Sequence, residues 1–254
     1  MILENQKAIV TGGGDGIGRG IALRLAEEGA DIAVVDINAQ SAEKASEEVR
    51  KKGRKSLPLV LDVSNHKDVK KAVDTVLREW GQIDIVVNNA GISPKKNGVK
   101  VNLVEMSDEE WDRVIRVNLT GMFYFCKACL PSMMARRYGK IVNISSVSGK
   151  TGGFAGGIHY VTSKAGIIGF TKALAKEVAP YGLNANVVMP SRIETKLGLN
   201  ISQELLQLRL SQIPLGRFGT PEDVAEGVLF LVNHRASSWM TGATLNLSGG
   251  ALMD

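Results

Sequence analysis

Tyr160 and Lys164, four residues apart, form the pair in this sequence with the clearest capacity for chemistry. On a helix, residues at this spacing lie on the same face about one turn apart. A nearby ammonium favours phenolate over phenol, so the tyrosine could take up or release a proton near neutral pH. Ser145 and Ser146 stand shortly before this pair, at the end of a hydrophobic run and ahead of a glycine-rich loop. The sequence therefore predicts an acid–base centre, which needs a reactant from elsewhere in the chain.

A glycine-rich turn between the first predicted strand (7–11) and a helical pattern supplies a candidate binding site. Gly12, Gly16 and Gly18 follow the spacing Gly-x-x-x-Gly-x-Gly. Glycine permits positive φ and close backbone approach, and the free N–H groups of a helix start bind phosphate. Glycines also form ordinary turns, but a strand, a glycine turn and a helix in this order favour a dinucleotide site.

Two acidic residues indicate which dinucleotide would bind. Asp36 ends the second predicted strand (31–36), where a carboxylate can accept hydrogen bonds from the adenosine ribose. It could instead cap the helix that follows. Asp15 adds a second carboxylate, and no nearby arginine in the sequence is placed to neutralise a 2′-phosphate. Because like charges repel strongly at short range, the pattern predicts NAD(H) rather than NADP(H).

The remaining chain alternates strands and helices, which predicts a doubly wound α/β fold with a parallel sheet and right-handed crossovers. No linker or repeat interrupts residues 1–254, so we expect one domain. Asp62 and Val63 end the third predicted strand; Asp62 could contact adenine or cap the next helix. A helix is expected from a capping box at Ser107–Glu110 to about residue 136, with Asn118 inside it. Asparagine is a poor helix former, so Asn118 should have a specific partner. The predicted strands are 7–11, 31–36, 55–62, 83–88, 140–144, 184–190 and 243–247, and the other helices are 39–52, 65–80, one opening near 160 and one from 221.

Composition argues against several other classes of protein. The 254 residues carry a formal charge of +5, but the basic residues are scattered, and the densest group (50–55) lies at a predicted helix end. No nucleic-acid partner is therefore expected. The first residues lack the pattern of a signal peptide and no apolar run is long enough to span a membrane, so a cytoplasmic protein is predicted. Cys126 and Cys129 fall in an apolar helical pattern and are expected to be structural. The histidines lack metal-ligand spacing, so no metal is predicted.

Taken together, the motifs resemble the short-chain dehydrogenase/reductase family along nearly the whole chain. They are Thr11-Gly12-x-x-x-Gly16-x-Gly18, Asn88-Asn89-Ala90-Gly91, Asn118, Ser146, Tyr160-x-x-x-Lys164 and Pro190 followed by Thr195. The resemblance implies a seven-stranded Rossmann-like sheet, a nicotinamide cofactor and a homotetramer. It also implies an active site in which Tyr160 exchanges the proton, Lys164 lowers the tyrosine pKa and holds the ribose, and Ser146 orients the substrate oxygen. Asn118 resembles the family asparagine that holds a relay water.

The predicted cofactor contacts follow from the turn, the strand ends and this resemblance. Pro190-Ser191-Arg192 replaces the Pro-Gly found in many members, and the resemblance still implies contacts through the backbone of Ile193 and the hydroxyl of Thr195. Residues 191–215 resemble a substrate lid, whose leucines either line an apolar pocket or pack as a helix. The full set of predicted cofactor contacts is Gly12, Asp15, Gly16, Ile17, Gly18, Asp36, Ile37, Asp62, Val63, Asn89, Ala90, Gly91, Tyr160, Lys164, Pro190, Ile193 and Thr195.

Three functions are consistent with these residues. The first is an NAD(H)-dependent oxidoreductase that interconverts a secondary alcohol and a ketone, on a small alcohol, polyol, sugar acid or similar compound. The second is a 3-oxoacyl-thioester reductase, for which NADPH is expected; the loop at 93–106 is longer than in the fatty-acid-synthesis reductases. The third is a non-catalytic dinucleotide-binding regulatory protein, which would have little need for Ser146, Tyr160 and Lys164 together.

Overall fold

A computed structural model describes residues 1–254 except 97, 154–155, 195–206, 209 and 254. Within the described residues, seven parallel strands form one sheet in the order β3-β2-β1-β4-β5-β6-β7. The predicted doubly wound parallel fold is confirmed, and four of the predicted strands have the observed bounds. The strands are β1 (Lys7–Thr11), β2 (Asp31–Asp36), β3 (Ser56–Val60), β4 (Ile85–Asn88), β5 (Lys140–Ile144), β6 (Asn184–Pro190) and β7 (Thr244–Leu247).

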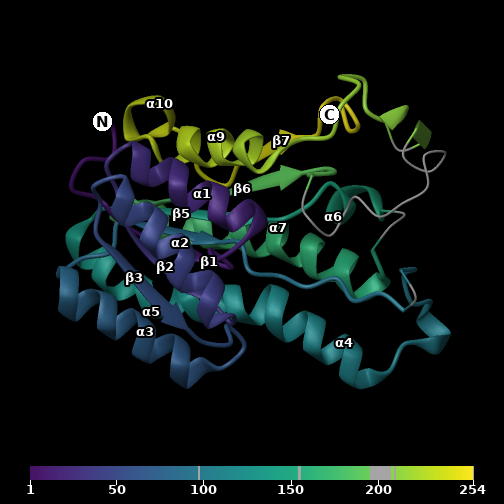
Figure 1. Ribbon diagram of the computed structural model, residues 1–254, viewed down its shortest axis with the longest axis horizontal. Coiled ribbons are helices and arrows are strands. Elements are labelled where there is room, and N and C mark those ends of the chain that lie inside the picture. Colours follow the sequence, from purple (N-terminus) through teal and green to yellow (C-terminus); the bar gives the residue numbers. More distant parts are fainter. Residues whose placement is uncertain (97, 154–155, 195–206, 209, 254) are drawn as a thin grey trace.

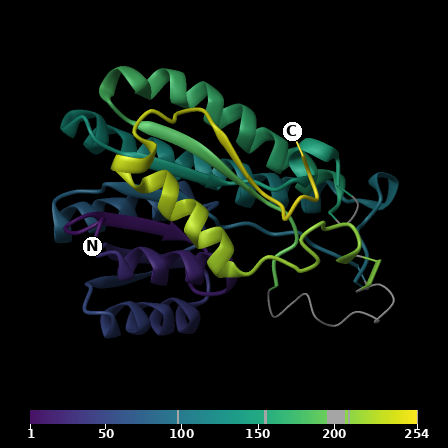
Figure 2. The ribbon, with the colours of Figure 1, turned by 90° about the horizontal axis from the view of Figure 1, so that it is seen from above.

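Helices cover both faces of the sheet. In Figure 1, α1 and α9 lie above the strands, whereas α3 and α4 lie below them. In the view from above in Figure 2, α7 and α2 lie at opposite sides of the molecule, with the strands between them. The helices are α1 (Gly16–Glu27), α2 (Ala39–Lys51), α3 (His66–Trp80), η1 (Leu103–Glu105), α4 (Asp108–Ile115), η2 (Arg116–Thr120), α5 (Gly121–Arg136), α6 (Ser148–Thr151), α7 (Ile158–Val178), η3 (Ala179–Tyr181), α9 (Pro221–Val232) and α10 (His234–Ser237).

Alternation along the strands explains this layering. Successive strand residues point to opposite faces, and neighbours such as Ile9 and Val10 are both fully buried, each in a different core. Val10 packs with residues of α1, α2 and α9, while Ile9 packs with residues of α3, α5 and α7. Strands buried on both sides read as continuous hydrophobic runs, which is why the sequence predicted them so well.

The predicted long helix at 107–136 is interrupted. It comprises α4, a π-helical turn (η2) and α5, and Asn118 lies in the π-helical turn. Single π turns often occur at functional sites. Ser107 caps α4 by accepting a hydrogen bond from the Glu110 N–H (3.2 Å), as predicted. The Glu110 carboxylate, however, contacts His159 at 2.9 Å instead of returning to the cap backbone, so it does not play its expected part in the capping box.

The chain order reverses between β1 and β4, which are neighbours in the sheet although β2 and β3 intervene in sequence. In open parallel sheets, ligands bind at the carboxyl ends of the strands beside such a reversal. Thr11, Asp36 and Asn88 end β1, β2 and β4 at this edge. Among the described residues, no helix has the length and apolarity needed to cross a membrane.

Candidate active site

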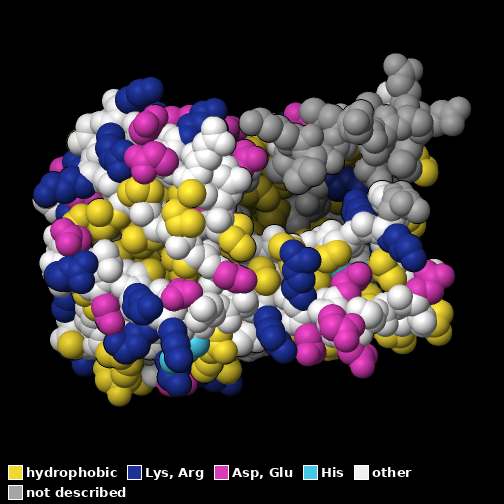
Figure 3. Space-filling view, turned by 60° about the horizontal axis from the view of Figure 1, so that its bottom comes forward, with side chains coloured by type: hydrophobic (Ala, Val, Ile, Leu, Met, Phe, Trp, Pro, Cys, Tyr) yellow, Lys and Arg dark blue, Asp and Glu magenta, His cyan; other side chains and the backbone are white. Residues whose placement is uncertain are grey.

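A cavity of about 850 Å³ lies at the carboxyl edge of the sheet. Figure 3 shows a hollow with hydrophobic side chains inside it and charged side chains around its rim. Among the described residues, three predicted site residues are not part of the cavity lining: Gly16 and Gly18 lie in the first turn of α1, and Asn118 is buried. Thr195 lies outside the described residues. The predicted site residues that line the cavity are Gly12, Asp15, Ile17, Asp36, Ile37, Asp62, Val63, Asn89, Ala90, Gly91, Ser146, Tyr160, Lys164, Pro190 and Ile193.

The glycine turn has the close contacts that glycine alone permits. Gly12 has a φ of +62°, and a Cβ on Gly18 would lie 1.9 Å from the Gly12 carbonyl oxygen. Asn89, at the end of β4, donates from its amide to the Thr11 and Gly12 carbonyls at 3.0 and 3.2 Å. Gly12 and Ile17 face the cavity. The turn is therefore tied to two strands, and it places the start of α1 where a phosphate could bind.

Asp36 holds the glycine turn and also faces the cavity. Its carboxylate accepts from the Gly14 N–H at 3.0 Å and from the Asn38 N–H at 3.0 Å. The cap of α2 is Asn38, whose side chain accepts from Ser41, so Asp36 is not the helix cap that the sequence allowed. Because each carboxylate oxygen can accept more than one hydrogen bond, Asp36 can still accept from a ribose.

Two further acids belong to the same cavity. Asp15 precedes α1 without a side-chain capping bond, so its exposed carboxylate is not used by the helix. Asp62 accepts from the Ser64 N–H at 2.8 Å, while Asn65 caps α3. Asp62 is therefore not the helix cap, and it remains a candidate for the adenine end of the cavity.

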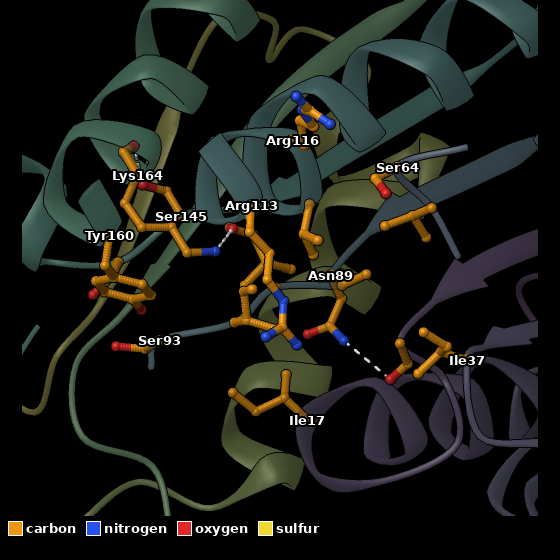
Figure 4. Close-up of a pocket in the computed structure, with 18 of the residues that line it drawn as sticks. Ile17, Ile37, Ser64, Asn89, Ser93, Arg113, Arg116, Ser145, Tyr160 and Lys164 are labelled. Atoms are coloured by element: carbon orange, nitrogen blue, oxygen red, sulfur yellow. Dashed lines mark hydrogen bonds between the residues drawn. The ribbon is translucent and has the colours of Figure 1, made fainter. Parts of the chain in front are cut away.

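The sequence interpretation missed two arginines. Arg113 and Arg116, from α4 and η2, line the same cavity as Asp36. Figure 4 shows Arg113 extending between Asn89 and Ile17, with Arg116 nearer Ser64. The expectation that no arginine is placed to neutralise a 2′-phosphate considered only residues near the turn in sequence, and the packing of α4 brings two arginines from elsewhere into the same cavity. In the sequence, only one feature could have pointed to these arginines: they lie three residues apart, about one helical turn, shortly before Asn118.

Ser145 and Ser146 have different surroundings. The Ser145 hydroxyl donates to the Lys164 carbonyl at 2.7 Å, inside the protein, which is a packing role. Ser146 lines the cavity together with Tyr160, acts to lower the pKa of that phenol, and accepts from the Ser148 N–H at 3.2 Å. Ser146 is therefore the serine placed to share a substrate oxygen with Tyr160.

Tyr160 is held between the loop and α7. A Cβ on Gly156 would lie 2.6 Å from the tyrosine ring, so glycine allows the loop to pass directly over it. Burial raises the pKa of Tyr160, and the hydrogen bond to Ser146 acts in the opposite direction. In the protein alone the phenol is thus protonated at neutral pH, and the desolvation of the phenolate, rather than the nearby Lys164, sets the direction in which its pKa shifts.

Lys164 lies beneath the tyrosine. Its ammonium donates to the Ile144 carbonyl at 2.8 Å and lies 5.7 Å from the centre of the Tyr160 ring. Burial lowers the pKa of Lys164 from 10.5 to about 8. Both side chains face the cavity, so the predicted pair does share one face of a helix.

The side chain of Asn118 is fully engaged with protein partners. Its carbonyl accepts from the Ile92 N–H at 2.7 Å, and its amide donates to the Ile92 carbonyl and the Ser163 hydroxyl, both at 3.0 Å. The specific partner expected for a helical asparagine is therefore present, since Asn118 clamps η2 to the loop after β4 and to α7. Both amide hydrogens are occupied, so a relay water could meet Asn118 only by donating to its side-chain oxygen or through the backbone.

The cysteines and the acidic residues suggest no other chemistry. Cys126 and Cys129 are free and buried, and burial raises the pKa of Cys126 to about 12, which makes the thiol unreactive. Over the described part of the chain, no group of three or more His, Cys, Asp or Glu side chains could hold a metal ion.

Comparisons with known proteins agree with this geometry. The family profile described as "Enoyl-(Acyl carrier protein) reductase" matches residues 12–251. The chain is 40% identical over 253 residues to the 3-oxoacyl-[acyl-carrier-protein] reductase FabG of Thermotoga maritima, covering 100% of both chains. It belongs to the short-chain dehydrogenase/reductase family. FabG of Aquifex aeolicus is 41% identical over 249 residues, with 98% of each chain covered.

Solved structures of short-chain dehydrogenase/reductases match the fold closely. A 3-oxoacyl-[acyl-carrier protein] reductase from Brucella melitensis has a TM-score of 0.94 and 38% identity, covering 99% of this chain and 93% of that one. Another Brucella melitensis structure of such a reductase, with bound NAD, has a TM-score of 0.91 and 38% identity, covering 99% and 94%. The family prediction is thus confirmed, and these relatives favour the second predicted function over the first.

Proposed function

We propose that this oxidoreductase reduces the 3-oxo group of an acyl thioester to a 3-hydroxy group. The observation that carries the proposal is that Ser146, Tyr160 and Lys164 line one cavity with the glycine turn, with the Lys164 ammonium 5.7 Å from the centre of the Tyr160 ring. Relatives about 40% identical over their full length are named 3-oxoacyl-[acyl-carrier-protein] reductases, which supports a thioester on an acyl carrier as the substrate. A small alcohol or polyol is the less favoured substrate.

The residues around the cavity fit a dinucleotide. The glycine turn leaves no room for a Cβ at Gly18, the start of α1 faces the cavity, and Asp36 keeps capacity to accept hydrogen bonds. Gly12 and Ile17 would hold the phosphates, Asp36 a ribose, and Lys164 the second ribose. A bound nicotinamide would supply the hydride.

Residues of the chain supply the proton for the reduction. Tyr160, whose phenol is protonated at neutral pH, donates its hydroxyl proton to the oxygen that gains negative charge as the carbonyl is reduced. Ser146 donates a hydrogen bond to the same oxygen and holds it in place. Lys164 faces the tyrosine ring with a positive charge, which stabilises the phenolate left after the proton has moved. In the oxidising direction the same groups act in reverse.

For the cofactor, we infer a preference for NAD(H). Asp36 and Asp15 both face the cavity, and a 2′-phosphate beside them would be repelled. Arg113 and Arg116 line the same cavity from α4 and η2, but the two acids belong to the turn and the strand end that would hold the ribose, so we expect the acids to decide the preference. The related Brucella melitensis reductase with bound NAD is consistent with this choice. We also expect the family's homotetramer, one domain over residues 1–254 and a cytoplasmic location.

The direct test is to assay acetoacetyl-CoA, acetoacetyl-acyl carrier protein and a panel of secondary alcohols and polyols with each cofactor. We expect turnover of the thioesters with NADH to exceed turnover of the simple alcohols with NAD, and Tyr160→Phe to abolish it. A reductase that prefers NADPH would refute the cofactor inference alone. Faster turnover of a polyol would favour the first function. Activity unchanged in Tyr160→Phe would refute the acid–base role.

A further inference from the structure

His159, the residue before the proposed acid, is completely buried in the first turn of α7. A Cβ on Gly157 would lie 2.7 Å from the His159 ring, so the chain entering the helix packs directly on the imidazole. Adjacent helical residues point about 100° apart, and His159 accordingly points away from the cavity that Tyr160 faces. It does not line the cavity, so any influence it has on the reaction is indirect.

The two ring nitrogens of His159 have defined partners. The backbone N–H of Tyr160 lies 2.6 Å from Nδ1, and Nε2 lies 2.9 Å from Oε1 of Glu110. A backbone N–H can only donate, so Nδ1 must be unprotonated. A carboxylate can only accept, so Nε2 must carry the hydrogen. One neutral tautomer satisfies both contacts, and Glu110 selects it.

The backbone of Tyr160 needs this acceptor. The first N–H groups of an α-helix have no acceptor within the helix, and side chains at the start usually satisfy them. At α7 the cap position is Gly157, which has no side chain. His159 takes over that role for one N–H group, and the group belongs to the residue whose hydroxyl must reach the substrate.

Glu110 connects this contact to a second helix. It lies in the first turn of α4 with 28% of its side chain exposed, and it is free to reach His159 because Ser107 alone caps the helix. From there α4 runs along the cavity, past Arg113 to η2 and Asn118. The helix that borders the cofactor cavity is thereby joined to the start of the helix that carries Tyr160.

We propose that Glu110 and His159 are positioning residues for Tyr160, an inference that rests on the acid–base role proposed above. The pair fixes the backbone of Tyr160 at the entry of α7, and so fixes where the phenol stands relative to Ser146. Proton transfer requires heavy atoms within hydrogen-bonding distance, and a displacement of about 1 Å can cost on the order of a hundredfold in rate.

The kinetic test compares variants at both ends of the pair. His159→Leu, which keeps bulk but removes both hydrogen bonds, should lower kcat for acetoacetyl-CoA reduction at least tenfold. KM and the Kd for NADH should stay within about twofold. His159→Asn, whose amide can both accept and donate, should recover much of the loss. Glu110→Ala should lower kcat and Glu110→Gln should not, because glutamine can still accept from Nε2.

Asp108→Ala is the matched control for Glu110→Ala. Asp108 is also an acid in the first turn of α4, but it is exposed and no hydrogen bond joins its side chain to His159. Both changes remove a carboxylate that favours the helix start, but Glu110→Ala also leaves the buried His159 Nε2–H without its acceptor, so it should lower the unfolding temperature further. A loss of kcat as large in Asp108→Ala as in Glu110→Ala, or equal losses in kcat and NADH binding in His159→Leu, would refute the positioning role.

A spectroscopic measurement tests the pair without activity. In the NMR spectrum of protein labelled with ¹⁵N-histidine, His159 should show an unprotonated Nδ1 and a protonated Nε2. The sequence contains only two other histidines, His66 and His234, so the signals that disappear in His159→Asn are those of His159. A protonated Nδ1 would overturn the inference even if the enzyme is active. Absence of turnover by the wild-type protein would instead refute the proposed function, and the tautomer would then decide the structural inference alone.

Discussion

Raising the pH should inactivate this enzyme through Lys164, well before Tyr160 loses its proton. The Lys164 ammonium is buried and donates to the Ile144 carbonyl at 2.8 Å, and burial lowers its pKa from 10.5 to about 8. At about 1.4 kcal/mol for each pH unit, the site disfavours the charged lysine by about 3 kcal/mol. The cation is nevertheless retained at pH 7, where the proposed mechanism uses it.

The size of the effect follows from the same value. One pH unit above the pKa, about one lysine in ten remains charged, so kcat/KM for NADH should fall about tenfold for each unit above about pH 8. Reduction also needs a protonated Tyr160, but burial raises the pKa of that phenol above its ordinary value of 10. Deprotonation of Lys164 and deprotonation of Tyr160 therefore occur at well separated pH values. The fall in kcat/KM that begins near pH 8, called the limb near pH 8 below, reports the lysine.

The assay is the initial rate of acetoacetyl-CoA reduction at subsaturating NADH between pH 6 and 11, because kcat/KM reports the groups of the free enzyme. The informative variant is Lys164→Arg, since arginine stays charged throughout this range. Its activity will be lower, but the limb near pH 8 should disappear. A limb at the same pH in Lys164→Arg, or a wild-type profile that is flat to pH 10, would show that the reasoning is wrong.

Two further substitutions test the glycine turn and a buried charge remote from it. In Gly18→Ala the new Cβ would lie 1.9 Å from the Gly12 carbonyl and 2.5 Å from the Asn89 amide, so we expect about 1–3 kcal/mol lower stability and at least tenfold weaker NADH binding by fluorescence titration. Unchanged binding would refute the assignment of the turn. Lys140 is buried and its ammonium donates to the side-chain oxygen of Asn184 at 2.6 Å, and burial lowers its pKa to about 8. Because the folded pKa lies below the unfolded one, the native state binds fewer protons between about pH 8 and 10.5, and wild-type stability should rise by up to about 3 kcal/mol across that window relative to Lys140→Met. Urea unfolding of both proteins at pH 7, 9 and 10 measures this difference, and parallel profiles would contradict it.

Much of the fold could be predicted because it depends on local patterns. The run at 32–35 is apolar and short, and Asp31 and Asp36 bound it, so the strand limits seen in the sequence are its limits in the structure. The spacing of Tyr160 and Lys164 likewise determines that they share a face on any helix. The π-helical turn around Asn118 was not predictable, because an unusual residue inside a helical pattern does not say how the backbone accommodates it.

By itself, then, the sequence determined the doubly wound sheet, the glycine turn and the types of group that could do the chemistry, since periodicity and turn residues act over only a few positions. Only the tertiary structure brought Arg113 into the cavity of Asp36 and joined Glu110 to His159. Burial likewise decided that the pKa of Tyr160 rises although Lys164 is close. Such contacts and desolvation arise where segments dozens of residues apart pack together, and no local pattern records them.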